Sequence, residues 1–130
     1  MRYLVTGSQM RAIDQDTIQN IGIPSLVLME RAAECVARKA EQLCDQKTLQ
    51  ILAICGVGNN GADGVAAARM LYLHGFDVLV VVVGNEAHAT KEFEVQKGIA
   101  EKLEIPVVDW EHFLHGEDEQ KAGDRAIIDA

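Results

Sequence analysis

The sequence predicts an α/β fold with a mainly parallel sheet, helices on both faces of that sheet, and two helices before it. One observation is the order of the elements: after two helical segments, short apolar runs alternate with segments of helical periodicity, which is typical of parallel sheets with crossover helices. The other is size, because 130 residues that are 48% hydrophobic and 25% charged suit one globular domain. We therefore expect residues 1–130 to form one domain or part of one.

Two helices are predicted at the start of the chain. Thr6 followed by Gln9 has the pattern of a capping box, and apolar side chains then recur at helical spacing, so a first helix is expected from about Gly7 to Asn20. Gly22 is placed to end it. A second helix is expected from Pro24 to about Cys44, because proline suits a first helical turn. Its apolar stripe consists of Leu26, Met29, Ala33, Val36, Ala40 and Leu43.

A right-handed βαβ unit is predicted next. The mostly apolar run 49–55 is typical of a buried parallel strand, and a glycine-rich turn follows it. A third helix is expected to begin near Asp63 and to stop at Gly75. The apolar run from Asp77 to Val83 then predicts a second strand.

The last third of the chain predicts one more helix and two strands. Thr90 can cap a helix over residues 91–104, which Pro106 ends, and residues 107–110 suggest a short edge strand. The polar residues 111–124 are expected to be loop or a short helix. Residues 125–130, "RAIIDA", predict a buried strand with Asp129 toward its carboxyl end. Because such a strand would leave the sheet unfinished, we expect the sequence to be a fragment of a longer protein.

Composition argues against several classes of function. The net charge is -8 and no cluster of Lys and Arg is present, which disfavours nucleic acid as a partner. The longest apolar run, residues 78–83, is too short to span a bilayer. We therefore expect a soluble cytoplasmic protein without a targeting segment. Cysteines 35, 44 and 55 lack the spacing of a zinc site or a disulfide framework, and histidines 74, 88, 112 and 115 lack that of a metal site.

The glycine-rich turn is the leading candidate for a binding site. Residues 56–61, "GVGNNG", fit the G-x-G-x-x-G pattern of dinucleotide-binding proteins. Three features disfavour a nicotinamide dehydrogenase: the amides of Asn59 and Asn60, the carboxylate of Asp63, and the lack of an acidic residue at the end of the second strand. A purely structural alternative has the asparagines in a left-handed turn and Asp63 as a helix cap. The clustering of these residues favours function, because binding loops sit on rigid scaffolds.

Four blocks of sequence then resemble one family. "GNNGADGVAAARML" at residues 58–71 resembles the G-N-N-G-G-D-G-x-x-x-A-R-x-L signature of the NAD(P)H-hydrate epimerases, the YjeF N-terminal-domain family. The segments "QMRAID", "GIPSLVLMERAA" and "IIDA" resemble that family's other blocks in the same order. The resemblance implies a Rossmann-like three-layer αβα domain, often a homodimer. It also implies an isomerase that interconverts the R and S hydrates of NADH and NADPH in cofactor repair, and in many bacterial members a fused dehydratase domain.

The resemblance assigns roles to particular residues. It implies that the substrate-binding residues are Asn59, Asn60, Gly61, Ala62 and Asp63. It also implies that Asn60 and Asp129 hold a potassium ion, and the oxygen atoms of an amide and a carboxylate are suitable ligands for it. Asp63 is the candidate acid or base within the chain.

Two departures from the family pattern qualify this assignment. Ala62 replaces a glycine, which requires a negative φ at that residue. The downstream aspartate and serine of the family are absent, so we expect weak or no epimerase activity from the chain alone. A non-catalytic nucleotide-binding or scaffold module and an NAD-dependent dehydrogenase are the alternatives. The sequence does not distinguish NADH from NADPH as the preferred cofactor.

Overall fold

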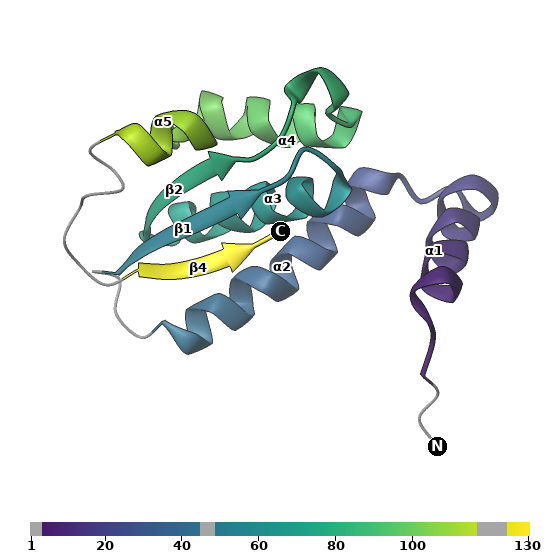
Figure 1. The fold of residues 1–130 in the computed structure, drawn as a ribbon. Helices are drawn as coiled ribbons and strands as arrows, with labels where there is room; N and C mark the ends of the chain where they lie inside the picture. The colour runs from purple at the N-terminus through teal and green to yellow at the C-terminus, as the bar shows by residue number, and fades with distance from the viewer. Residues whose placement is uncertain (1–3, 45–48, 117–124) are drawn as a thin grey trace.

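The computed structural model describes residues 4–44, 49–116 and 125–130, and the predicted α/β order is confirmed within them (Figure 1). The elements are α1 (Gly7–Asp16), the π-helical turn η1 (Thr17–Ile21), α2 (Ser25–Leu43), β1 (Gln50–Cys55), α3 (Asn59–Leu73), β2 (Asp77–Val82), the 3-10 turn η2 (Glu86–His88), α4 (Lys91–Lys102), β3 (Val107–Asp109), α5 (Trp110–His115) and β4 (Arg125–Asp129). None of the described helices is long and apolar enough to cross a membrane.

The described strands form one parallel sheet in the order β3-β2-β1-β4. From β1 the chain moves outward through β2 to β3 and then returns to place β4 on the other side of β1. The direction of strand progression therefore reverses between β1 and β4. Open α/β sheets bind ligands at such a switch point, beyond the carboxyl ends of the strands.

Both edges of the described sheet can be compared with the prediction. β3 lies at one edge, as expected. β4 was expected to be buried, and that expectation is wrong for the described residues: β4 forms the other edge, and Ile127 is 63% exposed. The reason is that α5 covers only part of this face. Its Phe113 ring lies 5.8 Å from the Arg125 guanidinium carbon, but the helix leaves Ile127 uncovered.

Helices lie on both faces of the sheet, so the three-layer αβα arrangement is confirmed. Side chains of β1 alternate between the faces, as successive residues of a strand must. Ile51, Ala53 and Cys55 pack in the larger core with α2, α3 and α4, whereas Leu52 packs with Phe113 of α5 in a smaller one.

The capping box predicted for α1 is confirmed. The Gln9 amide donates to Thr6 Oγ1 at 3.2 Å, and the Thr6 amide donates to Gln9 Oε1 at 2.8 Å. The helix does not run to Asn20 as predicted. Thr17 Oγ1 donates to the Ile13 carbonyl at 2.8 Å, a bond that often bends helices, and the chain continues as η1. Gly22 ends the turn at φ 92°, as predicted.

The apolar stripe predicted on α2 is only partly buried. The buried residues are Met29, Ala33 and Ala37, spaced by four along the face that packs on α3. Leu26, Val36 and Leu43 are 39%, 40% and 73% exposed. These three remain exposed because a stripe in steps of three and four is wider than one helix contact, and α3 covers only one side of it.

The remaining boundaries follow the prediction closely. Thr90 caps α4 by accepting from the Phe93 amide at 3.2 Å. The helix ends at Lys102, earlier than residue 104, because Glu104 takes a left-handed conformation at φ 62°. The short helix expected within residues 111–124 is α5, which begins at Trp110, and residues 117–124 lie outside the described residues.

Candidate functional site

The glycine-rich segment is the first turn of a helix. α3 begins at Asn59, four residues before the predicted start near Asp63, and Gly58 is its N-cap residue. The structural alternative, with the asparagines in a left-handed turn and Asp63 as the cap, is therefore wrong. Ala62 is helical, so its φ is negative as the sequence required. The predicted start is too late because a close approach of α3 to β1 lets the helix begin immediately after the turn.

Two glycines of α3 permit that approach. A Cβ atom added at Gly61 would lie 3.0 Å from the Gly56 nitrogen, and closer still to the Gly56 carbonyl group. A Cβ atom at Gly64 would lie 2.7 Å from Ala130 Cβ and 2.9 Å from Cys55 Sγ. These positions therefore press the start of α3 against the carboxyl ends of β1 and β4, which is the switch point of the sheet.

The first turn of α3 presents two different faces, because residues four apart in a helix share a face. Asn59 and Asp63 both line a cavity of about 680 Å³. Asn60 shares its face with Gly64, which packs on Ala130 at the end of β4. Of the predicted substrate-binding residues, Asn59 and Asp63 thus line the cavity, Asn60 lies on the face of Gly64, and Gly61 and Ala62 are buried between them.

The cavity lies between α3, α2 and the N-terminal helix. Figure 1 shows α1 on the side of the sheet to which the strand arrows point. The cavity is lined by Met10, Arg11, Asp14, Gln15, Ile18 and Gln19 of the N-terminal segment, by Ser25, Leu28, Met29 and Ala32 of α2, and by Asn59, Asp63 and Glu92. The sequence prediction missed the polar groups of α1. A possible signal was the polar pair Arg11 and Asp14 within a block that resembles the family.

The Asp63 carboxyl group lies in an environment that raises its pKa. Its carboxyl group is half-buried, and burial raises its pKa above the usual range, with a smaller contribution from the negative charge of Asp14. A carboxyl group with a raised pKa in a cavity is a candidate acid–base catalyst. The structure thus gives this residue a suitable environment for the role that the sequence suggested.

Asn60 and Asp129 lie at the same edge of the sheet. Asp129 is the last residue of β4 and pairs with Ile54 near the end of β1, and both candidate ligands are exposed. Their amide and carboxylate oxygens, beside the backbone carbonyls of the strand ends, are the hard donors that suit an alkali cation. Among the described residues, no group of three His, Cys, Asp or Glu side chains is arranged to hold a metal ion.

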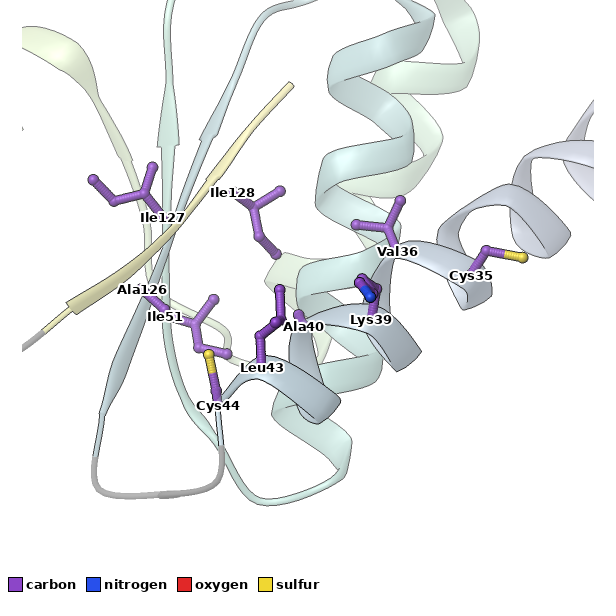
Figure 2. Close-up of a pocket in the computed structure, with 10 residues that line it drawn as sticks. All are labelled: Cys35, Val36, Lys39, Ala40, Leu43, Cys44, Ile51, Ala126, Ile127 and Ile128. Carbon is purple, nitrogen blue, oxygen red and sulfur yellow. The ribbon is translucent and has the colours of Figure 1, made fainter.

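A second large cavity is chemically different. It has a volume of about 640 Å³, lies between α2 and β4, and is lined by Cys35, Val36, Lys39, Ala40, Leu43, Cys44, Ile51, Ala126, Ile127 and Ile128 (Figure 2). Figure 2 shows Ile128 directed toward α2 and Ile127 on the other side of the strand. These lining residues include no carboxyl group for acid–base chemistry, so the cavity under α1 is the candidate site.

Comparison with known families decides the relationship of the chain. The family described as YjeF-related protein N-terminus matches residues 25–130. The chain belongs to this family. The resemblance inferred from four short blocks is thereby confirmed, and the family match includes Asn59, Asp63 and Asp129 but starts after α1.

Two relatives of the chain share one name, NAD(P)H-hydrate epimerase. The NAD(P)H-hydrate epimerase of Limosilactobacillus fermentum is 48% identical over 103 residues, which cover 79% of this chain and 49% of that protein. The NAD(P)H-hydrate epimerase of Lentilactobacillus buchneri is 41% identical over 111 residues, which cover 83% and 50% respectively. The chain therefore spans about half the length of the curated relatives that it matches.

A solved structure shares the fold. The crystal structure of yeast ynu0, YNL200c, matches with a TM-score of 0.74 at 25% sequence identity, and the match covers 83% of this chain and 47% of that chain. The Rossmann-like arrangement expected from the family resemblance is confirmed.

Proposed function

We propose that this chain serves in the epimerisation of hydrated NADH and NADPH, interconverting their R and S forms as part of nicotinamide cofactor repair. The observation that supports this most directly is the position of Asn59 and Asp63, which line one cavity at the switch point of a sheet whose relatives are named NAD(P)H-hydrate epimerases. We take Asn59, Asn60, Gly61, Ala62 and Asp63 as the substrate-binding segment.

The chemistry requires one group that can give and take a proton near the C6 carbinol of the hydrated ring. Protonation of the hydroxyl oxygen lets water leave, and the ring nitrogen's electron pair then forms a C=N bond. Water can return on the other face, which resets the stereocentre; reversible opening of the ring gives the same outcome. In either route Asp63 is the residue of this chain that we assign to proton transfer, because burial raises its pKa.

Asn60 and Asp129 are our candidates for a potassium site. They would offer an amide oxygen and a carboxylate oxygen at the carboxyl end of β1 and β4. A cation at this position supplies positive charge that offsets nearby carboxylates and favours an anionic dinucleotide. The helix start itself offers unpaired backbone N–H groups and the positive end of the helix dipole to the phosphates.

We further propose that the protein forms a homodimer in the cytoplasm. The described cysteines are all free, which agrees with a reducing compartment. Apolar side chains of the N-terminal segment support self-association, since Met10, Ile13 and Ile21 are 47%, 51% and 68% exposed. Light scattering on the purified protein tests this proposal, and a monomer mass at micromolar concentration would contradict it.

The proposed function is tested by turnover and by binding on the purified chain. Conversion of purified R-NADPH hydrate to the S form is followed by chromatography above the spontaneous rate, with potassium present. We expect Asp63→Asn to lower any catalysed rate by about 100-fold or more. The matched control is Asp77→Asn, which removes an exposed carboxylate from the amino end of β2.

Binding is measured separately, because the chain alone is expected to turn over slowly. Addition of the hydrate should shift the amide NMR signals of Asn59, Asn60 and Asp63, and Asp129→Asn should reduce the effect of potassium on that binding. A chain that neither accelerates interconversion nor shows signal changes in α3 at millimolar hydrate would overturn the proposal.

A further inference from the structure

The N-terminal helix contributes charged side chains to the candidate site. Arg11 and Asp14 lie on the face of α1 that lines the cavity, opposite Asn59 and Asp63 of α3. The family match begins only at residue 25, so this wall of the cavity comes from a segment outside the matched region. Its contribution follows from the fold and not from the glycine-rich signature.

The charges that face Asp63 come from two elements. Asp14 and Arg11 face it from α1, and Glu92 faces it from the first turn of α4. Glu92 accepts a hydrogen bond from Ser25 Oγ at 3.2 Å, which holds its carboxylate toward α2. Burial raises the pKa of Asp63, and the negative charge of Asp14 raises it further.

We propose that Asp14 is a positioning residue of this site: it faces Asp63 across the cavity, and its negative charge acts on the Asp63 carboxyl group. Carboxylates that line one cavity repel each other, so the charge of Asp14 disfavours the ionised form of Asp63. The inference rests on the proposed function, because it gives the protonated Asp63 a task.

One proton leaves Asp63 and returns to it in each cycle. Protonated Asp63 donates its proton to the C6 hydroxyl oxygen of the hydrate, the C–O bond breaks, and water leaves while the ring nitrogen's electron pair forms the C=N bond. When water adds to the other face, its proton returns to the Asp63 carboxylate. Asp14 exchanges no proton in this cycle, and its charge makes Asp63 a stronger base for the return step.

The inference is tested first without any substrate. Carbon-13 NMR of the labelled 130-residue chain follows the titration of the Asp63 carboxyl carbon in the wild type and in Asp14→Asn. We expect the midpoint to fall part of the way toward that of an exposed aspartate, since burial remains the larger cause of the shift. Asp14→Glu keeps the negative charge, so the Asp63 midpoint should lie close to that of the wild type.

Asp16→Asn is the matched control. It removes the same charge from the last residue of α1, but Asp16 does not line the cavity. Its midpoint for Asp63 should equal that of the wild type, and circular dichroism should show equal helix content in all variants. Equal Asp63 midpoints in Asp14→Asn and in the wild type would overturn the inference, as would an equal fall in Asp16→Asn.

A kinetic measurement separates this inference from the proposed function. If Asp63 acts in its protonated form, activity declines as pH rises through its pKa, so Asp14→Asn should move that decline to lower pH with KM unchanged. If the NMR midpoint falls in Asp14→Asn but the chain neither catalyses interconversion of the hydrate nor binds it, the charge coupling stands and the epimerase proposal is contradicted. An unmoved pH profile in an active enzyme would contradict the role of Asp14.

Discussion

Replacement of Gly61 by alanine tests whether α3 depends on its close approach to β1. The added Cβ atom would lie 3.0 Å from the Gly56 nitrogen and inside the contact distance of its carbonyl group. Backbone atoms cannot rotate away, so the cost lies near the upper end of overpacking, about 3 kcal/mol. Alanine regains about 1 kcal/mol through its higher helix propensity. The expected net loss of about 2 kcal/mol corresponds to a fall in Tm of about 8 °C at this chain length.

Gly98→Ala is the control for that substitution. Gly98 lies within α4 and has no atom within 4 Å of an added Cβ. The same change should therefore stabilise the protein by about 1 kcal/mol, the difference in helix propensity. Thermal and urea unfolding of both variants, monitored by circular dichroism, give the two free energies. Equal stability of Gly61→Ala and Gly98→Ala would refute the steric reasoning, and with it the placement of α3 against Gly56.

Three further predictions concern charge, thiol reactivity and the sheet edge. Burial and the charge of Asp14 raise the folded-state pKa of Asp63. The stabilising contribution of Asp63 is therefore full below its unfolded-state pKa and is lost as pH rises through its folded-state pKa. Asp63→Asn should therefore increase the free energy of unfolding, measured in urea, more at pH 7 than at pH 4. Burial raises the pKa of the Cys55 thiol to about 12, so an aromatic disulfide reagent at pH 8 should label exposed Cys35 first and Cys55 only as fast as the protein unfolds; early labelling of Cys55, located by peptide mass mapping, would contradict its burial. Ile127→Lys places a charge on an exposed edge strand and should reduce concentration-dependent aggregation with little change in Tm; unchanged light scattering would show that β4 does not drive association.

Much of the fold followed from local sequence. The capping box at Thr6, the stop at Gly22, the cap at Thr90 and the βαβ order are set by residues within one or two turns of each other. Short-range rules therefore suffice for them. The boundary of α3 did not follow, because its start depends on Gly61 meeting Gly56 across the turn.

The site was predictable only in part, for a related reason. The glycine pattern identified the segment that contains Asn59 and Asp63, since turn chemistry and helix ends are local properties. The pattern could not show that these two residues share a cavity with Asp14, which lies on a separate helix. Neither could it show that the apolar stripe of α2 is covered only on the side of α3.

The sequence by itself determined the class of fold, the order of its elements and the segment that carries the chemistry, because periodicity, caps and glycines act over short distances. Only the tertiary structure decided that strand progression reverses between β1 and β4, that Asn59 and Asn60 face different sides of α3, and that Asp14 influences the charge of Asp63. These features depend on how separate elements pack, and the distances between packed elements are not encoded in the spacing of residues along the chain.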